Sequence, residues 1–315
     1  MRVGPAGRTR GGATKATDTA SMKTESVSPR SLGLDTWSPA EVLDGLYEGQ
    51  LSAVAAVRAA LPSIAAAVEL AVPRLRRGGR LVYAGAGTSG RIGVQDGVEL
   101  TPTFDWPASR IVWLVAGGAP ALIQAVEGAE DDYDAAVKEI DGHGVGADDI
   151  VISIAASGTT PYAIGALERG RARGALGIGM ASNPDAPLLK AAEVPILLDT
   201  GAELIAGSTR MKAGTAQKVA LNLFSTLAMV RLGRVYDGNM VDMQATNAKL
   251  RRRGVRMVMR VAGCDEGRAE AALAATNGRV KPAVLVARGL SADEARQALD
   301  KAEGFLRRAL DGLTS

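Results

Sequence analysis

Two glycine- and hydroxyl-rich stretches of this 315-residue chain hold residues that could bind a phosphate group. The first, LVYAGAGTSG at 81–90, places Gly87, Thr88 and Ser89 directly after an apolar run. The second, AASGTTPY at 155–162, also follows an apolar run and holds Ser157, Gly158, Thr159 and Thr160. Hydroxyls and unpaired backbone N–H groups converge on an anion where a strand passes into a helix. We therefore expect the two stretches to form one phosphate pocket; the alternative is a pair of ordinary tight connections.

The first stretch also has the spacing G-x-G-x-x-G, at Gly85, Gly87 and Gly90, which is typical of dinucleotide sites. Such a site requires an acidic residue at the end of the second strand, about 20 positions further on. The second apolar run, 110–116, ends without one, and Asp105 comes before that run begins. The missing acidic residue therefore favours a phosphate site over a nicotinamide dinucleotide site.

Five short apolar runs alternate with helical patterns along the chain, and each hydroxyl-rich stretch follows one of these runs. The runs are RLVYA (80–84), RIVWLVA (110–116), DIVISIA (149–155), ALGIGMA (175–181) and VPILLD (194–199). This alternation predicts an α/β fold with a parallel five-stranded sheet flanked by helices. Ligands of such sheets bind beyond the carboxyl ends of the strands, which is where both hydroxyl-rich stretches fall.

Helix signals surround the sheet region. Ser38, Pro39 and Glu41 indicate a helix start, followed by one or two long helices with a break at Pro62. A long apolar helix is expected over 211–234, ended by Gly233, and two or three short helices are expected beyond about residue 250. The predicted units are a disordered extension (1–21), a sheet domain with N-terminal helices (22–250) and a small helical domain (251–315).

The charge balance gives no sign of a nucleic-acid or membrane partner. The chain has 37 basic and 34 acidic residues, a net charge of +3. The basic clusters at 74–80 and 249–256 are interpreted as solvated helix ends. There is no uncharged apolar run of 18 residues, so no membrane span is expected, and residues 1–21 lack the apolar region of a secretory signal.

Cysteine and histidine are almost absent. One cysteine, Cys264, excludes an intrachain disulfide, and one histidine, His143, leaves no His/Cys cluster for a metal. We expect a reducing, cytoplasmic setting and no metal. His143 lies in the glycine-rich stretch DGHGVG and is interpreted as a surface-loop residue rather than a catalytic one.

Longer stretches resemble a known family. They are GGRLVYAGAGTSGRIGVQD (78–96), ELTPTF (99–104), AGGAPALIQAVEGAEDD (116–132), IAASGTTPY (154–162) and GAELIAGSTRMKAGTAQK (201–218). The chain resembles the sugar isomerase (SIS) domain, a flavodoxin-like fold, and within it the N-acetylmuramic acid 6-phosphate etherases. The resemblance extends from about Met22 to the C-terminus.

The resemblance implies a lyase that converts N-acetylmuramic acid 6-phosphate to N-acetylglucosamine 6-phosphate and D-lactate in cell-wall sugar recycling. In the open-chain sugar the C1 aldehyde acidifies the C2 proton. A base removes that proton, an acid protonates the departing C3 oxygen, and water then adds to the double bond. Such an elimination requires one base and one acid but no cofactor.

The resemblance also places the two carboxylates. It gives Glu99 the acid's role, and burial among small residues would favour its protonated form. The second position falls on Glu130, 31 residues later, as the C2 base, with Glu127 as the runner-up and the division of roles left open. Without the resemblance, Glu99 would be a solvated glutamate near a helix end. The run 127–132 would be a solvated helix C-terminus, where negative charge is unfavourable.

The stretch GSTRMKAGTAQK brings Ser208 and Lys212 to the start of a helix, where they could contact a carboxylate or phosphate. The alternative is that Ser208 or Thr209 only caps that helix. The family usually shows ECPPTF and ASGRTPY, whereas this chain has ELTPTF and ASGTTPY. Thr159 therefore replaces a usual arginine, which puts the fine substrate preference in doubt more than the reaction class.

The resemblance implies a phosphorylated amino-sugar substrate and a homodimer with sites near the interface. Three alternatives are weighed. A sugar-phosphate-binding regulator of this class has two tandem SIS domains, and this chain is long enough for only one. An aldose–ketose isomerase would not require the second acid. A transcriptional regulator would need a basic helix-turn-helix before the sheet, which is not evident.

Overall fold

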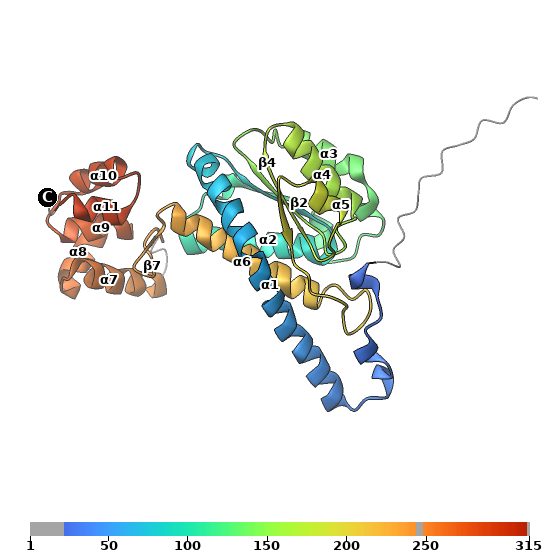
Figure 1. Cartoon of the computed structure of the whole chain (residues 1–315). Coiled ribbons are helices and arrows are strands. Elements are labelled where there is room, and N and C mark those ends of the chain that lie inside the picture. Colours follow the sequence, from blue (N-terminus) through green and yellow to red (C-terminus); the bar gives the residue numbers. More distant parts are fainter. Residues whose placement is uncertain (1–21, 244–247, 314–315) are drawn as a thin grey trace, which may run out of the picture.

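A computed structural model of the chain describes residues 22–243 and 248–313. The N-terminal extension predicted for 1–21 lies outside these residues. The described chain forms a sheet-containing body, against which α6 (Lys212–Arg231) packs, and a smaller helical lobe beyond the C-terminal end of α6 (Figure 1). Three short 3-10 turns lead from residue 23 into the first long helix; they are η2 (Lys23–Glu25), η3 (Pro29–Ser31) and η4 (Leu34–Thr36).

The body is built on a five-stranded parallel sheet with the order β2-β1-β3-β4-β5. All five predicted strands are confirmed, with ends shifted by at most two residues. They are β1 (Leu81–Gly85), β2 (Ile111–Val115), β3 (Ile150–Ile154), β4 (Leu176–Ala181) and β5 (Val194–Leu197). β1 and β3 are neighbours, and a short η5 (Ala108–Arg110) precedes β2.

Helices cover both faces of the sheet, because nearly every strand residue is buried and must be packed on both sides. On one face Tyr83, Ile152 and Ile178 pack with residues of α1, α2 and α6; on the other Val82, Leu114 and Val151 pack against α3, α4 and α5. The bounds are α1 (Pro39–Arg76), α2 (Gly87–Phe104), α3 (Tyr133–Gly142), α4 (Pro161–Ala172) and α5 (Pro187–Ala191). The predicted α/β fold is confirmed.

The first helix starts as predicted but does not break. Ser38 and Glu41 form a reciprocal capping box, with Pro39 in the first turn. The predicted break at Pro62 is wrong, because α1 continues through it to Arg76. The ring removes one backbone hydrogen bond, but Ala60 and Ile64 on either side are buried in the core, and this packing holds the helix together.

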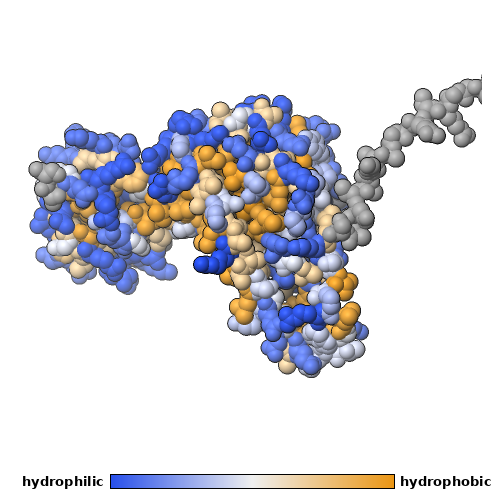
Figure 2. Space-filling model, in the orientation of Figure 1, coloured by the Kyte–Doolittle hydropathy of each residue, from blue (hydrophilic) through white to orange (hydrophobic). Residues whose placement is uncertain are grey.

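One side of α1 remains uncovered. Its buried residues pack on the sheet and on α6, but a row of apolar side chains on another side is 40–66% exposed: Leu43, Tyr47, Leu51, Val54 and Leu61. Figure 2 shows apolar side chains gathered over the face formed by α1 and α6. By length and composition α1 could span a membrane, but a third of its most apolar window is buried inside this body. Its buried residues are those of a core helix.

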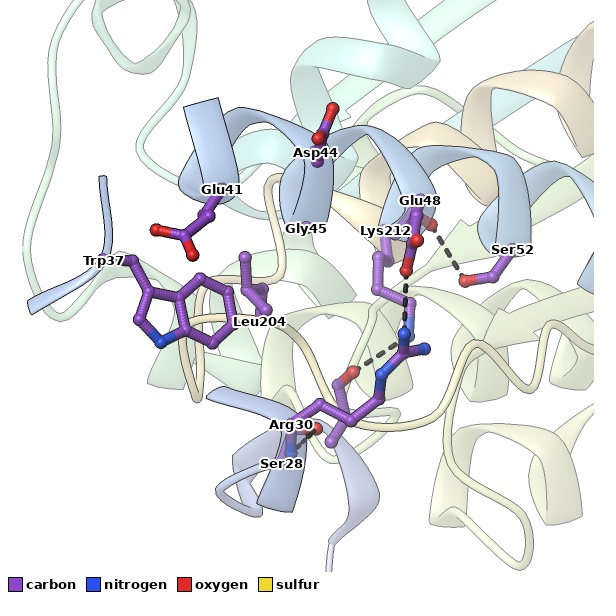
Figure 3. Close-up of a pocket in the computed structure, with 12 residues that line it drawn as sticks. Ser28, Arg30, Trp37, Glu41, Asp44, Gly45, Glu48, Ser52, Leu204 and Lys212 are labelled. Atoms are coloured by element: carbon purple, nitrogen blue, oxygen red, sulfur yellow. Dashed lines mark hydrogen bonds and ion pairs between the residues drawn. The ribbon is translucent and has the colours of Figure 1, made fainter. Parts of the chain in front are cut away.

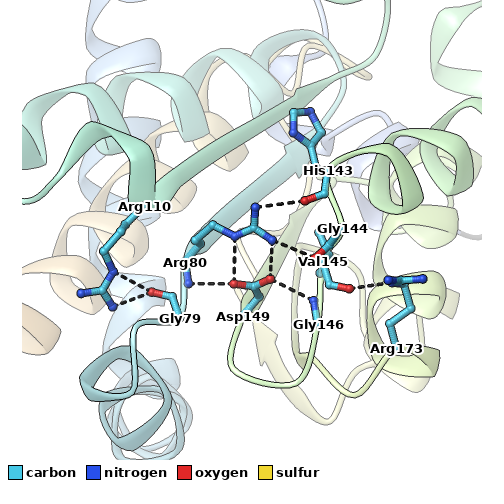
Figure 4. Close-up of polar contacts among 9 residues, drawn as sticks. All are labelled: Gly79, Arg80, Arg110, His143, Gly144, Val145, Gly146, Asp149 and Arg173. Carbon is cyan, nitrogen blue, oxygen red and sulfur yellow. Dashed lines mark hydrogen bonds and ion pairs between the residues drawn. The ribbon is translucent and has the colours of Figure 1, made fainter.

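Charged residues at the amino end of the sheet connect the segments that precede its strands (Figure 4). The Arg80 guanidinium binds Asp149 at 2.7 Å and donates to the carbonyls of His143 and Gly144 at 3.0 and 3.1 Å. Burial works to raise the pKa of Asp149, but hydrogen bonds from Arg80 and Gly146 hold it below its usual value. The His143 side chain is exposed, as predicted, and only its carbonyl takes part in this network.

The helical lobe has its own apolar core, and the prediction of two or three helices was too low. It contains the two-stranded ribbon β6 (Val235–Tyr236) and β7 (Asn239–Met240), then α7 (Ala248–Ala262), α8 (Glu266–Ala275), α9 (Val280–Ala287), α10 (Ala292–Lys301) and α11 (Leu306–Asp311). Val241 and Met243 also belong to this core, although they precede the boundary expected at residue 250. The position of that boundary remains a prediction.

Candidate active site

The two hydroxyl-rich stretches lie side by side at the carboxyl edge of the sheet, because they follow the neighbouring strands β1 and β3. The turn after β1 is very tight. A Cβ atom on Gly90 would lie 2.7 Å from the carbonyl oxygen of Gly85, and one on Gly85 would lie 2.9 Å from that of Ile154. Glycine at these two positions therefore lets the start of α2 approach the strand ends, as the spacing of the motif requires.

The first loop packs against the start of α6. Ser89 is buried and donates a 3.0 Å hydrogen bond to Oε1 of Gln217. The methyl group of Thr88 lies next to Gly214; the residue is half-buried, and its hydroxyl makes no hydrogen bond to another described residue. Thr88 therefore has a hydroxyl free for a ligand, whereas Ser89 anchors the loop to α6.

The second loop is held from behind and leaves its threonine hydroxyls free. Gly158 has φ +71°, and its carbonyl accepts from Leu188 N at 3.0 Å. Thr159 N donates to Oγ of Ser157 at 3.2 Å, and Thr160 precedes α4 without capping it by its side chain. Among the described residues, no hydrogen bond engages the hydroxyls of Thr159 and Thr160.

Unpaired buried polar atoms gather near this edge. In the described part of the chain, three buried side-chain atoms lack a hydrogen-bond partner: Ser182 Oγ, Thr200 Oγ1 and Gln217 Nε2. Ser182 directly follows β4, Thr200 lies three residues after β5, and Gln217 holds the first loop. Buried polar groups are almost always paired, so their clustering at the strand ends marks this edge as a polar ligand site.

The start of α6 brings the third predicted segment to the same place. The capping alternative for Ser208 and Thr209 is wrong, because the carboxylate of Glu203 accepts from Lys212 N and Ala213 N, both at 3.0 Å. Glu203 is 1% exposed. Sequence reasoning missed it; its only signal was its place in the family-like stretch 201–218.

Lys212 lies beside a cavity of about 370 Å³ between α1, the N-terminal segment and the loop before α6 (Figure 3). Its ammonium donates to the carbonyl of Ala202 at 2.8 Å. Burial lowers the pKa of Lys212, although Glu203 and Asp199 act in the opposite direction. The Arg30–Glu48 ion pair, at 2.8 Å, crosses the cavity. The lining residues are Ser28, Arg30, Trp37, Glu41, Asp44, Gly45, Glu48, Gly49, Ser52, Ala202, Leu204 and Lys212, so neither hydroxyl-rich loop borders it.

The two predicted catalytic glutamates do not meet within one chain. Glu99 lies on α2 about 18 Å from the start of the helix, at 1.5 Å per residue, toward the amino end of the sheet. Glu130 lies in η7 (Ala129–Asp131), which packs against α4 on the other face of the sheet. Both are exposed, and no hydrogen bond or ion pair between them occurs in the described chain. The expected burial of Glu99 is therefore wrong for the single chain.

The acidic run around Glu130 is also different from its expected form. Asp132 caps α3 and accepts from Ala135 N at 2.8 Å, so the run precedes a helix instead of ending one. Negative charge is favourable there, and the electrostatic mismatch inferred for 127–132 does not exist. Glu127, the runner-up, is exposed as well.

Some apolar residues close in sequence to the two glutamates are exposed. Val98, adjacent to Glu99, is 52% exposed. Ile123, in the loop between η6 (Ala119–Leu122) and Glu130, is 92% exposed, and Val126 is 40% exposed.

A buried polar cluster that sequence reasoning missed lies one helical turn before Glu99. Asp96 is 4% exposed and accepts hydrogen bonds from Tyr83, Asn222 and Ser225. Burial raises the pKa of Asp96 despite these hydrogen bonds. Its signal was its i, i+3 spacing from Glu99, which puts both carboxylates on neighbouring positions of α2.

The parallel five-stranded sheet and its flanking helices have the architecture of an SIS domain. The family model described as "Glucokinase regulatory protein N-terminal SIS domain" matches residues 63–171. A phosphoheptose isomerase from Francisella tularensis is 20% identical, with a TM-score of 0.45, covering 61% of this chain and 97% of that one.

Curated relatives then give the particular family. An N-acetylmuramic acid 6-phosphate etherase of Deinococcus radiodurans is 54% identical over 289 residues, 91% of this chain and 95% of the relative. One of Streptomyces avermitilis is 46% identical over 290 residues, 92% and 93% of the two chains. The chain belongs to the N-acetylmuramic acid 6-phosphate etherase family.

Proposed function

We propose that this protein is a carbon–oxygen lyase that cleaves the D-lactyl ether of N-acetylmuramic acid 6-phosphate. The products are N-acetylglucosamine 6-phosphate and D-lactate, in the recycling of cell-wall sugar. The observation that carries this proposal is 54% identity to a named etherase along 91% of the chain. The free hydroxyls at the carboxyl edge of the sheet support it, because they suit the substrate's phosphate.

The sugar phosphate is proposed to bind between the loops after β1 and β3 and the start of α6. Thr88, Thr159, Thr160 and Ser208 have free hydroxyls among the described residues, and Gly87, Ser157 and Gly158 bring backbone groups close. Lys212 begins α6, but its ammonium donates to the carbonyl of Ala202 beside the separate cavity, so a contact with the phosphate requires this side chain to turn toward the loops. Holding the phosphate away from the breaking bond positions the sugar and helps the chemical step.

The elimination is proposed to run on Glu99 and Glu130. One removes the C2 proton of the open-chain sugar, and the other protonates the C3 ether oxygen as the C2–C3 double bond forms. The C3–O bond breaks in this step and D-lactate leaves; water then adds across the double bond, with its hydroxyl at C3 and a proton returned to C2. Among the described residues, no group of three His, Cys, Asp or Glu side chains could hold a metal ion.

The working form is proposed to be a cytoplasmic homodimer. Glu99 and Glu130 lie on different faces of one chain, and each is next to exposed apolar residues. A second copy seated on α1 would cover its exposed apolar row, and the proposed dimer brings the Glu99 of one chain to the Glu130 of the other. Burial of Glu99 in such an interface would favour its protonated form.

One assay tests the proposal. The purified protein is incubated with N-acetylmuramic acid 6-phosphate in heavy-oxygen water, and the label in both products is followed by mass spectrometry. Elimination followed by hydration places the label on C3 of the sugar and none in the D-lactate. No lactate release would leave only a sugar-phosphate-binding regulator, the function suggested by the matching regulatory SIS model. Label in the lactate would replace elimination by attack of water on the lactyl carbon.

A further inference from the structure

Helix α7 of the helical lobe carries an unusual concentration of positive charge. Residues 248–262 contain six basic and no acidic side chains. The 249–256 cluster, interpreted as a solvated helix end, occupies the N-terminal half of α7, and most of its basic side chains are exposed. Positive charge there is unfavourable with the helix dipole. The charge therefore does not serve the stability of the helix.

The apolar side of α7 is already covered. Gly254, Met257 and Val258 are buried, and the side chains of Met257 and Val258 pack in the core of the lobe. Basic amphipathic helices that lie on membranes must present their apolar side to the lipid, which α7 cannot do without opening this core. Figure 2 shows hydrophilic side chains along the edge of the lobe where α7 lies.

Three of the arginines converge on a hollow of about 260 Å³ between α7 and the β6–β7 ribbon. Arg260 Nη1 lies 3.4 Å from Oδ1 of Asn239, at the rim of the ribbon. The lining residues are Gly238, Asn239, Met240, Arg253, Arg256, Met257 and Arg260, so three arginines and no Asp or Glu line the hollow among the described residues.

Nearby carboxylates are engaged elsewhere. Asp237 pairs with Arg307, and Asp242 pairs with Lys281 at 2.6 Å. Glu270 lines a different hollow together with Arg251. Arg253, Arg256 and Arg260 make no ion pair with any described residue.

We propose that Arg253, Arg256 and Arg260 form a binding site for the phosphate group of a small ligand, separate from the strand-end loops. One guanidinium group can bind two oxygens of a phosphate through two parallel hydrogen bonds. The hollow is concave and the size of a small molecule, which favours a phosphate or phosphate ester over a nucleic-acid backbone. This proposal does not depend on the lyase activity.

The test is isothermal titration of the whole protein with inorganic phosphate and, separately, with glucose 6-phosphate. R256Q/R260Q should lose one binding site per chain, with affinity there lowered at least about tenfold. The matched control, R251Q/R252Q, removes the same charge from the same helix but outside the hollow, and should bind as the unchanged protein does. Binding of phosphate alone identifies the free anion as the ligand; binding of both extends the site to esters.

A second measurement protects the test against a variant that does not fold. In the unchanged protein, phosphate should slow amide hydrogen exchange over 236–240 and 253–260. The proposal is overturned if neither titrant protects these segments, or if R256Q/R260Q binds both titrants as well as R251Q/R252Q. It is also overturned if both double variants weaken equally and duplex DNA competes, because the helix would then be a nucleic-acid surface.

Discussion

The hydroxyl of Tyr83 on β1 donates a 2.7 Å hydrogen bond to Oδ2 of Asp96 on α2, inside the layer between the sheet and α6. The other oxygen of Asp96 accepts from Asn222 at 2.6 Å and Ser225 at 2.9 Å. The carboxylate thus has three neutral donors and no cation among them. It ties strand, helix and α6 together one turn before Glu99, so the direction of Glu99 depends on this cluster.

The first prediction concerns the pH dependence of stability. Burial raises the pKa of Asp96, so the folded state holds the proton more tightly than the unfolded state. The stabilisation from protonated Asp96 is complete below the pKa of this residue in the unfolded state. It is lost as the pH rises through the pKa of Asp96 in the folded state. From about pH 4 to pH 7 the unchanged protein should therefore lose stability relative to D96N, measured by urea unfolding. D35N, at an exposed site, is the control, and a difference that does not vary with pH would contradict the assignment.

The second prediction concerns the buried cap of α6. E203A should lower the free energy of unfolding by about 1–3 kcal/mol, because it leaves the N–H groups of Lys212 and Ala213 without their acceptor. S208A should change it by less than about 0.5 kcal/mol, since Ser208 does not cap the helix. Equal losses in chemical denaturation would return the capping role to Ser208.

Local signals predicted the sheet well but the helix ends and the site geometry less well. Apolar runs fixed all five strands, and the capping box fixed the start of α1. The predicted helix break at Pro62 was wrong because core packing of the neighbouring residues outweighs the few kcal/mol by which a proline destabilises a helix. Glu203 and Asp96 were missed because their roles depend on partners 9 to 129 residues away. No sequence pattern could show that Glu99 and Glu130 lie on opposite faces of one chain.

The third prediction tests the two glutamates. E99Q and E130Q should each lower kcat roughly 10²–10⁴-fold, because each removes a proton-transfer group. If they meet across a two-fold interface, a mixed dimer of the two variants has one intact site. Refolding an equal mixture should then recover about a quarter of the unchanged activity. Mixtures as inactive as the separate variants would place both glutamates of each site on the same chain, and full activity in either variant would remove that residue from the mechanism.

The fourth prediction concerns the exposed row on α1. L51E/V54E places two like charges in the proposed interface, and charges there cannot be buried without partners. The variant should elute as a monomer in size exclusion with light scattering and should lose lactate release, while its circular dichroism is unchanged. L313K, an exposed apolar site on the helical lobe, is the matched control and should stay dimeric. An active, dimeric L51E/V54E would place the interface elsewhere.

The last prediction concerns Thr159, where the family usually carries an arginine. Its side chain is half-buried in the second loop, and its hydroxyl is free among the described residues. T159R adds a fixed charge that can form paired hydrogen bonds with the phosphate. KM for the phosphorylated substrate should fall about tenfold, with kcat little changed, because the contact is equally strong in ground and transition states. T159Q, a shorter polar side chain without charge, should show no such fall; if both variants lower KM equally, contact area rather than charge sets affinity at this loop.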